Sequence, residues 1–427
     1  MQVFQYPQRH TWSSLLQRPA LDAAALEKST RKVLAKVQQG GDRTVRRFTK
    51  QFDGIALRNL AVTTKEIAAA AKQIDPNLRA AIDVAMENIR CFHAAQLRNE
   101  EVISTMPGIQ CWRKMVPIEK VGLYIPGGTA PLFSTLLMLG IPATLAGCKE
   151  IVVCSPPDKD GKLHPAILYA ANQLGITKIF KIGGIQAIAA MAYGTETVPQ
   201  VYKIFGPGNQ YVTAAKQLVQ QEGVAIDMPA GPSEVCVLAD ETAVPAFVAA
   251  DLLSQAEHGA DSQVLLVSTS ATLIGTVKKC IDEQLQQLPR ADIARLALNN
   301  SKAIVLENMQ DAIDLVNAYA AEHLILASDD AVTLAPQIVN AGSVFVGNYA
   351  PESVGDYASG TNHTLPTNGY ARAYSGVSVD SFVKKITFQT LSQDGLKAIG
   401  NAVITLAEAE GLTAHAEAVR IRLENQQ

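Results

Sequence analysis

Between residues 124 and 233 the hydrophobic positions fall into short apolar runs, each followed by a glycine or proline turn and a longer helical stretch. "EIVVCSPP" (150–157) precedes "HPAILYAANQLG" (164–175), and "VYKIFGPGN" (201–209) precedes "QYVTAAKQLVQQEG". Short apolar strands that alternate with helices are typical of parallel βαβ units. This part of the chain is therefore predicted to form an α/β core.

A second α/β core is predicted from residue 234 onward. "EVCVLAD", "QVLLVSTS" and "KAIVLE" have the composition of buried strands, and "PAFVAADLLSQAEHG" and "ATLIGTVKKCIDEQL" that of helices. After "KAIVLE", the stretch "NMQDAIDLVNAYAAEHL" (308–324) is predicted to be one helix. "AGSVFVG" is a further strand, and residues 348–376 form a long turn-rich loop.

The two ends of the chain are predicted to be mainly helical. A helix is expected over Leu21–Gln39, ending at Gly40-Gly41, and another over Asn77–Gln96. Thr63 and Glu66 fit a capping box at the start of a helix between these two. "IQCWRKMVPI" (109–118) alternates as a strand does, and the tail, 377–427, is expected to be largely helical.

Composition narrows the class of protein. The 427 residues include 37 basic and 40 acidic ones, giving a net charge of −3, so neither a nucleic-acid nor a membrane surface is an expected partner. The N-terminus, "MQVFQYPQRHTW", lacks the pattern of a signal peptide, so a cytoplasmic location is expected. No C-x-x-C pair occurs, and the cysteines are expected to be buried thiols. They are Cys91, Cys111, Cys148, Cys154, Cys236 and Cys280.

One uncharged stretch, Val121–Cys148, is long enough to cross a membrane. Prolines at positions 126, 131 and 142 and two adjacent glycines interrupt it, and each would break a spanning helix. We therefore expect a buried strand, a glycine-rich turn and a buried helix.

The glycine turns leave a nucleotide site open as a possibility. The G-x-G-x-x-G fingerprint of dinucleotide-binding folds does not occur, but "GPGNQY" (206–211) has two of its glycines between a strand and a helix. That placement suits an anion at a helix N-terminus. It equally suits a simple turn from strand to helix.

Several polar residues are candidate metal ligands. Gln255 and His258 lie three residues apart on a predicted helix, so they share a face. Asp356 and His363 lie in a polar loop, and His415 follows between two tail helices. Imidazole, carboxylate and amide oxygen suit zinc or a similar divalent ion. Each residue alone also fits a structural role, and the spacing leaves the reaction open.

As a set, the motifs of this chain resemble the histidinol dehydrogenase family over essentially the whole length. In order they are "VGLYIPGGTAPLFST" (121–135), "FGPGN" (205–209), "DMPAGPSEV" (227–235), "LLSQAEHG" (252–259), "EHL" (322–324), "SGTNHTLPT" (359–367) and "EGLTAH" (410–415). The resemblance implies a four-electron oxidation of L-histidinol through L-histidinal to L-histidine with two NAD+, the last step of histidine biosynthesis. It also implies a homodimer with one Zn2+ per subunit.

The resemblance also implies the roles of single residues. Glu322 and His323 match the catalytic acid–base pair. The zinc ligands correspond to Gln255, His258, Asp356 and His415, and these ligands together with Ser233, His323, His363 and Glu410 form the expected substrate site. The positions that contact NAD are Tyr124, Gln186 and Asn209.

The implied architecture is α/β, with two incomplete Rossmann-like βαβ domains and small helical N- and C-terminal extensions. The expected divisions are an N-terminal extension (1–20), a first α/β domain with most of the metal and catalytic site (21–123 plus 234–376), a second, NAD-contacting α/β domain (124–233), and a helical tail (377–427). The tail is expected to reach the partner subunit, so that Glu410 and His415 contribute to the partner's site.

Two other activities are alternatives. A cysteine-dependent aldehyde dehydrogenase would use Cys111, Cys148 or Cys154 as its nucleophile. A zinc hydrolase would use Glu322 to activate a metal-bound water.

Overall fold

A computed structural model of the chain describes residues 1–18, 23–97, 101–127, 132–229 and 231–424. The chain divides into two compact units. Unit 1 comprises Met1–Gln96 and Glu119–Phe382, and unit 2 comprises Leu97–Ile118 and Val383–Gln427. This division differs from the boundaries expected from the sequence. Within the described residues, no helix has the length and apolar character needed to span a bilayer.

The first sheet of unit 1 has five parallel strands in the order β6-β5-β4-β7-β8. Its strands are β4 (Lys120–Tyr124), β5 (Glu150–Ser155), β6 (Lys178–Lys181), β7 (Lys203–Phe205) and β8 (Ala225–Ile226), and they alternate with α5 (Phe133–Ala146), α6 (Pro165–Gln173), α7 (Gly184–Tyr193) and α8 (Gln210–Gln221). The predicted βαβ rhythm of this region is confirmed.

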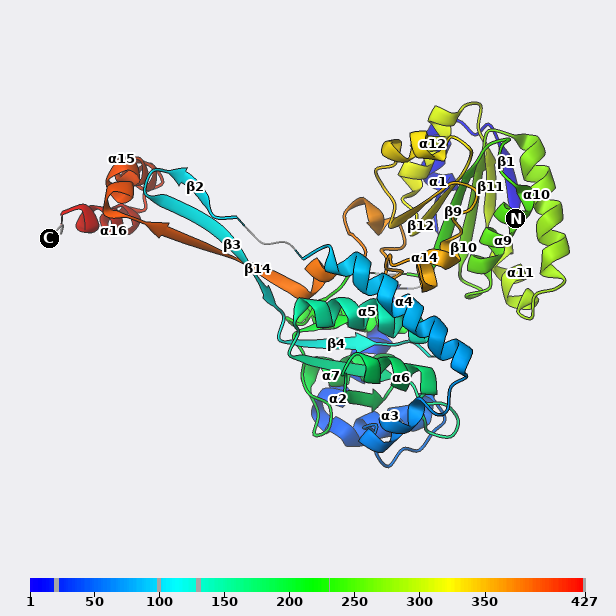
Figure 1. Cartoon of the computed structure of the whole chain (residues 1–427), viewed down its shortest axis with the longest axis horizontal. Helices are drawn as coiled ribbons and strands as arrows, with labels where there is room; N and C mark the ends of the chain where they lie inside the picture. Colours follow the sequence, from blue (N-terminus) through cyan, green and yellow to red (C-terminus); the bar gives the residue numbers. More distant parts are fainter. Residues whose placement is uncertain (19–22, 98–100, 128–131, 230, 425–427) are drawn as a thin grey trace. The chain divides into compact units, whose positions relative to one another are not determined.

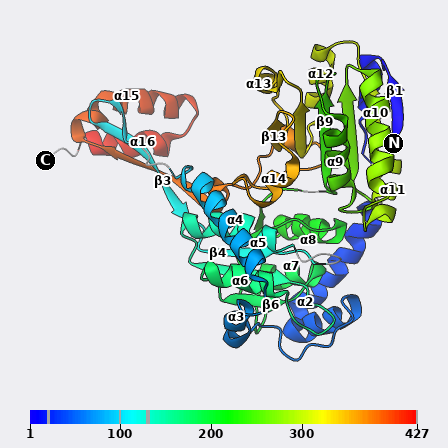
Figure 2. The same cartoon turned by 45° about the vertical axis from the view of Figure 1, so that its right-hand side comes forward.

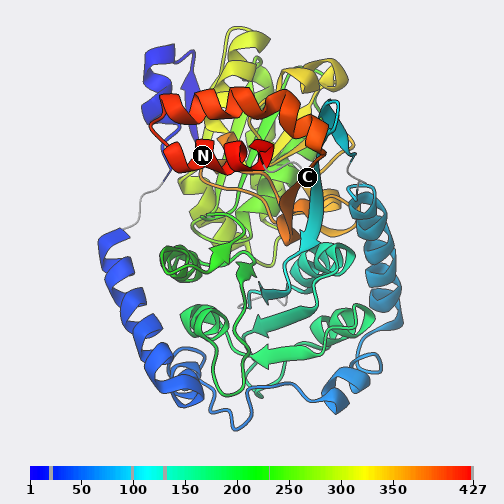
Figure 3. The ribbon, with the colours of Figure 1, turned by 90° about the vertical axis from the view of Figure 1, so that its left-hand side faces the viewer.

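Helices cover both faces of the five-stranded sheet. The chain runs from β4 to β6 in one direction and then returns to β7, so right-handed crossovers place α5 and α6 on one face and α7 and α8 on the other. The N-terminal helices pack outside them: α2 (Ala23–Phe52) on α7 and α8, α3 (Thr64–Ala70) on α6, and α4 (Pro76–Ala94) on α5. Figure 3 shows α2 and α4 as long blue helices on opposite sides of this sheet. The sequence had grouped these N-terminal helices with the other sheet.

Two local predictions in the N-terminal helices have clear outcomes. Thr63 and Glu66 form the predicted capping box, in which each side chain bonds the backbone N–H of the other. The glycine pair does interrupt the first helix, because Gly41 has φ +47°, but the helix continues past this kink to Phe52.

The second sheet of unit 1 has six parallel strands in the order β1-β11-β10-β9-β12-β13. The strands are β1 (Gln2–Gln5), β9 (Glu234–Ala239), β10 (Gln263–Ser268), β11 (Lys302–Val305), β12 (His323–Ala327) and β13 (Ser343–Val346). One face packs on α9 (Pro245–Ala256), α10 (Ala271–Leu285) and α11 (Ala291–Asn299), and the other on α1 (Trp12–Leu15), α12 (Met309–Tyr319) and α13 (Ala331–Leu334) (Figure 2). The N-terminal extension is thus an edge strand of this sheet.

The predicted helix over 308–324 is wrong in its last turn. Helix α12 ends at Tyr319, Ala320 adopts a left-handed conformation with φ +54°, and His323 begins strand β12. Every residue from Tyr319 to Ala327 is buried, and such a run has the same pattern at the end of a helix as in a central strand. Glu322 and His323 therefore lie at the entrance to a central strand of the sheet.

Unit 2 combines an antiparallel sheet with two helices (Figure 1). Its strands β2 (Ile103–Met106), β3 (Ile109–Pro117) and β14 (Val383–Leu391) lie in the order β14-β3-β2, and α15 (Gln393–Ala409) packs against α16 (Thr413–Glu424). The tail is therefore not only helical, because its first part is a nine-residue strand. Large apolar side chains of this sheet, among them Ile103, Ile386 and Phe388, are exposed in the single chain.

Candidate active site

The Glu322–His323 pair is buried where the central strands β9 and β12 begin. Glu322 is 5 % and His323 3 % exposed. The backbone N–H of Glu234, the first residue of β9, donates to Glu322 Oε2 over 2.9 Å. His323 Nδ1 lies 3.4 Å from the Glu234 carbonyl oxygen and 3.7 Å from Glu322 Oε2. The carboxylate and the imidazole are thus held by the backbone of one neighbouring residue.

The polar loop after β13 brings two more predicted residues to this pair. Asp356, on the short helix α14 (Glu352–Tyr357), has Oδ1 at 3.2 Å from His323 Nε2. His363 Nδ1 lies 2.8 Å from the Asp356 carbonyl oxygen, and His363 Nε2 lies 3.4 Å from Thr135 Oγ1 on α5. The loop therefore connects the Glu322–His323 pair to a helix that packs on the five-stranded sheet.

Gln255 and His258 approach the same cluster from the C-terminal end of α9. Gln255 is fully buried, and neither Oε1 nor Nε2 of its amide has a hydrogen-bond partner among the described residues. His258, just beyond the helix, keeps solvent contact. Desolvation nevertheless lowers the pKa of His258, while the Asp356 carboxylate opposes this shift. An unsatisfied buried amide costs about 1–3 kcal/mol, so a missing ligand at Gln255 is the natural explanation.

The cluster contains more buried carboxyl groups than the sequence indicated. Burial raises the pKa of Glu322 to about 8, that of Glu352 to about 8 and that of Asp251 to about 7. Burial alone would lower the pKa of His323, but the Glu322 and Asp356 carboxylates raise it to about 10. The buried carboxyl groups therefore favour a positive charge within this cluster, and the negative end of the α9 helix dipole favours it as well.

The donors present fit a metal ion only in part within unit 1. No group of three or more His, Cys, Asp and Glu side chains in the described part of the chain is placed to hold a metal. Unit 1 supplies three of the four predicted ligands: one histidine, His258, one carboxylate, Asp356, and the amide of Gln255. The fourth, His415, belongs to unit 2. The orphaned amide of Gln255 and the excess of buried carboxyl groups both suit a cation.

The remaining predicted substrate residues are more exposed. Ser233 is partly buried and immediately precedes β9, where its carbonyl oxygen accepts a bond from the Gln263 N–H. Glu410 and His415 lie in unit 2, at the junction of α15 and α16, and both are exposed in the single chain.

A pocket of about 910 Å³ opens at the carboxyl ends of the five-stranded sheet. Tyr124, Gln186 and Asn209 all line it: Tyr124 is the last residue of β4, and the other two follow β6 and β7. The Tyr124 hydroxyl accepts a bond from the Gly184 N–H, and Asn209 caps the start of α8. Open α/β sheets bind ligands at this edge. The three predicted cofactor residues are therefore brought together in one pocket.

The glycine turn "FGPGN" has a structural reason for its first glycine. Gly206 has φ +126°, and a Cβ there would meet the Tyr124 carbonyl oxygen at 2.1 Å. Its N–H donates to Asp227 Oδ2, its carbonyl accepts from Lys216 Nζ, both at 2.8 Å, and Lys216 and Asp227 form a buried ion pair. The turn is thereby fixed against the end of β4, beside the pocket.

Sequence reasoning missed Asp53, which lines the same pocket. Gln186 Nε2 donates to Asp53 Oδ2 over 3.2 Å, and burial raises the pKa of Asp53 to about 6. Asp53 follows the end of α2, and its local sequence, "QFDG", reads as an ordinary helix end. Nothing in that pattern indicates that the chain folds it against residue 186.

Comparisons with known proteins agree over the whole chain. The histidinol dehydrogenase family profile matches residues 16–423. A histidinol dehydrogenase of Bacteroides fragilis (strain YCH46) is 60 % identical over 424 residues, covering 99 % of both chains. One of Xylella fastidiosa (strain Temecula1) is 53 % identical over 410 residues, covering 96 % of this chain and 95 % of the relative. The crystal structure of histidinol dehydrogenase from Elizabethkingia anophelis superposes with a TM-score of 0.97 at 54 % identity, covering 99 % and 98 %.

Asp53→Asn is expected to stabilise the protein in a pH-dependent way. The folded chain binds the Asp53 proton more tightly than the unfolded chain does, because its Asp53 pKa is raised. The free energy of unfolding therefore falls as Asp53 ionises between about pH 4 and pH 6, and it stays lowered at higher pH. Above pH 6 the variant should be more stable by about 1–2 kcal/mol, which is less than the full equivalent of the raised pKa because Asp53 is partly solvated. Urea unfolding of both proteins between pH 4.5 and 8 measures the difference. An offset that does not change with pH would contradict this account.

Proposed function

The chain belongs to the histidinol dehydrogenase family, and on this basis we propose that Glu322 and His323 are its catalytic pair. The protein is an NAD-dependent oxidoreductase that oxidises histidinol in histidine biosynthesis. We further propose the full four-electron reaction, from L-histidinol through L-histidinal to L-histidine, with two NAD+ used in turn. The observation that carries the proposal is the buried Glu322–His323 pair in one cluster with the Gln255 amide, whose polar atoms have no hydrogen-bond partner among the described residues.

The proposed metal ligands are Gln255, His258 and Asp356 of one subunit with His415 from the tail of a second copy, holding one Zn2+ per subunit. The unsatisfied amide of Gln255 supports this, since neither of its polar atoms has a hydrogen-bond partner among the described residues, and so does the Asp356 carboxylate, whose charge acts on His258. When bound, the ion would supply a template for the imidazole and amine nitrogens of histidinol. Because Gln255 is neutral, this ligand set carries one negative charge, that of Asp356.

His323 is proposed to move the protons. Its Nδ1 faces the Glu234 carbonyl, a contact that favours the tautomer with hydrogen on Nδ1. Nε2 now faces Asp356 Oδ1 at 3.2 Å, and once Asp356 binds the proposed metal instead, Nε2 would accept the hydroxyl proton of histidinol while the hydride of the carbinol C–H bond would pass to NAD+. The same carboxylates that raise the His323 pKa stabilise the imidazolium formed.

Glu322 is proposed to act in the second half of the reaction. Water must add to the aldehyde before a second hydride can leave, and the carboxylate of Glu322 can take the proton from that water. With its pKa raised to about 8 by burial, Glu322 is a stronger base than an ordinary glutamate. His323 would then accept the proton of the hydrated aldehyde. His363 is proposed to orient the oxygen that enters the carboxylate, and Ser233 to contact the substrate.

The proposed NAD site is the pocket at the carboxyl ends of the five-stranded sheet, with Tyr124, Gln186 and Asn209 as contacts. Thr135, in the first turn of α5, has Oγ1 at 3.4 Å from His363 Nε2, and Tyr124, the last residue of β4, lines the pocket. The β4–α5 unit thus supplies one residue beside each of the proposed cofactor and substrate sites.

Burial disfavours two of the three candidate cysteine nucleophiles, Cys148 and Cys154. Burial raises the pKa of the Cys148 thiol to about 12, and burial also raises the pKa of Cys154, which is fully enclosed in β5. A catalytic thiol needs a lowered pKa instead. The cysteines of the described residues are all free, which fits the reducing cytoplasm as the proposed location.

We propose a homodimer in which the C-terminal tail completes the partner's active site. Glu410 and His415 are exposed in the single chain although the reaction needs them near a substrate. The exposed apolar side chains of unit 2, such as Ile386 and Phe388, supply the kind of surface that a partner covers.

The overall reaction is tested with purified protein, L-histidinol and NAD+, following the nicotinamide absorbance. We expect two NADH per histidinol, loss of activity on chelation and recovery with Zn2+. Gln255→Leu should lose bound metal and activity together. One NADH per histidinol, or no NADH at all as expected of a hydrolase, would contradict the proposal.

Glu322→Gln is expected to separate the two half-reactions. Oxidation of histidinol to histidinal should be largely retained, because His323 takes that proton, whereas oxidation of histidinal should fall by about 100-fold or more, as is typical for loss of a general base. Rates measured separately with each substrate test this. Equal loss with both substrates would mean that Glu322 has no specific role toward water.

Hybrid dimers test the shared site. His415→Asn and His323→Asn should each be nearly inactive alone. After subunit exchange, half of the dimers should be mixed and each should have one intact site, so about a quarter of the parental activity should return. No recovery, despite exchange shown by a size-tagged subunit, would mean that each site is built from one chain.

A further inference from the structure

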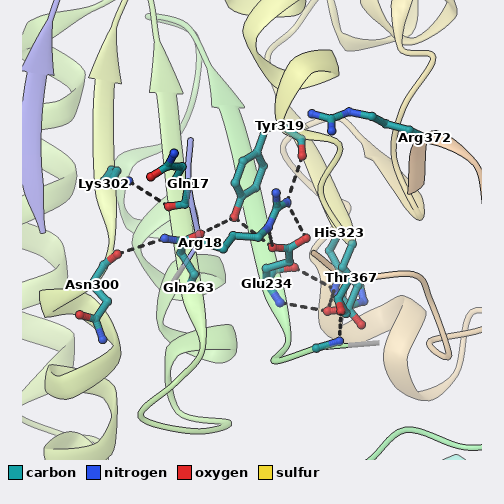
Figure 4. A network of polar contacts seen from close by, with 12 residues as sticks. Gln17, Arg18, Glu234, Gln263, Asn300, Lys302, Tyr319, His323, Thr367 and Arg372 are labelled. Atoms are coloured by element: carbon teal, nitrogen blue, oxygen red, sulfur yellow. Dashed lines mark hydrogen bonds and ion pairs between the residues drawn. The ribbon is translucent and has the colours of Figure 1, made fainter. Parts of the chain in front are cut away.

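A buried ion pair lies directly behind the catalytic residues (Figure 4). Arg18 contacts the Glu234 carboxylate with two bonds, Nε to Oε2 at 2.5 Å and Nη2 to Oε1 at 2.8 Å. The side chain of Glu234 is 2 % exposed and that of Arg18 15 % exposed. Such a forked contact fixes the orientation of both groups as well as their separation.

The backbone of Glu234 holds the catalytic pair while its side chain is held by Arg18. The Glu234 N–H donates to Glu322, and the Glu234 carbonyl faces His323 Nδ1. A shift of this residue would therefore move the partners of both catalytic groups at once.

Arg18 also fixes the turn that leads into the catalytic pair. Its Nη2 donates to the Tyr319 carbonyl at the end of α12, and its guanidinium lies 4.0 Å from the centre of the Tyr319 ring. The strained residue Ala320 and then Glu322 follow. The Tyr319 hydroxyl is 3.2 Å from Glu234 Oε2 and 3.0 Å from Gln263 Oε1, so it joins the same network.

These contacts leave Glu234 few ways to move. Its carboxylate is out of water, and separation from Arg18 would leave one buried charge without its partner, which is strongly unfavourable. The guanidinium bonds two elements together, the start of β9 and the end of α12. Arg18 itself comes from the N-terminal segment, far from both elements along the chain.

We propose that Arg18 is a positioning residue for the oxidation, which sets the alignment of Glu322 and His323 through Glu234 and Tyr319. The proposal rests on the catalytic roles proposed above for that pair. It assigns the N-terminal segment a part in the reaction beyond its strand in the sheet.

Arg9 provides a matched control. It comes from the same segment and pairs with Asp311 and Asp314 on α12, but it is exposed and does not touch Glu234. If Arg18 only attached the N-terminal segment to the sheet, Arg9 would share that role, and the two alanine variants would have similar effects on kcat.

The test compares Arg18→Ala, Arg18→Lys, Arg9→Ala and Glu322→Gln in the full-length enzyme. Arg18→Ala should lower kcat for both half-reactions by about 10- to 100-fold, the usual cost of losing a group that orients a catalytic residue, with little change in the KM for histidinol. Millimolar guanidinium chloride should restore part of the kcat of Arg18→Ala and none of that of Glu322→Gln. Arg9→Ala should keep the parental kcat.

Arg18→Lys keeps the charge but cannot make the forked contact and the bond to Tyr319 together, so it should fold and still lose kcat. If Arg18→Ala fails to fold, the kcat of Arg18→Lys decides. Parental kcat in the folded Arg18 variants, or equal losses in the Arg9 and Arg18 variants, would overturn the inference. A fully active Glu322→Gln would instead overturn the proposed catalytic pair, so the two failures are distinguishable.

Discussion

The parallel pairing of β9 with β12 is the constraint on which the rest of the site depends. His323 pairs with Val235, which places Glu322 beside the Glu234 backbone N–H and turns the imidazole toward Asp356. A slip of one residue in this register would exchange the two faces of β12 and move the imidazole away from the loop that carries Asp356 and His363. The Arg18–Glu234 contact and the left-handed turn at Ala320 both lie at the point where this register begins.

The two sheets of unit 1 present opposite edges to their ligand sites. In the five-stranded sheet the pocket lies at the carboxyl ends of the strands, as is usual for open α/β sheets. In the six-stranded sheet the candidate site lies at the amino ends, where β9 and β12 start and α9 finishes. The end of α9 presents Gln255 and the negative end of a helix dipole, which suits a cation rather than the phosphates of a dinucleotide.

Local pattern was enough to predict the βαβ runs and the Thr63–Glu66 capping box, because both depend on neighbours in sequence. It failed at 320–323, because every residue from Tyr319 to Ala327 is buried and no glycine or proline separates the helix from the strand. Helical spacing suggested Gln255 and His258 only weakly, and the pairing of Glu322 with His323 came from family resemblance alone. Asp53 and Arg18 were beyond such reasoning, since their partners, Gln186 and Glu234, are brought to them only by the tertiary fold.

The edge strand β1 has a consequence for how the protein is made. Gln2 pairs with Lys302, so the first strand leaves the ribosome long before its partner exists. Until β11 is synthesised, β1 has no sheet to join, and closing so long a loop makes folding slow. The five-stranded sheet has no such delay, because its strands and the helices that cover it all lie before residue 227. The six-stranded sheet is therefore expected to form after it, with β12 among the last elements to reach its native place.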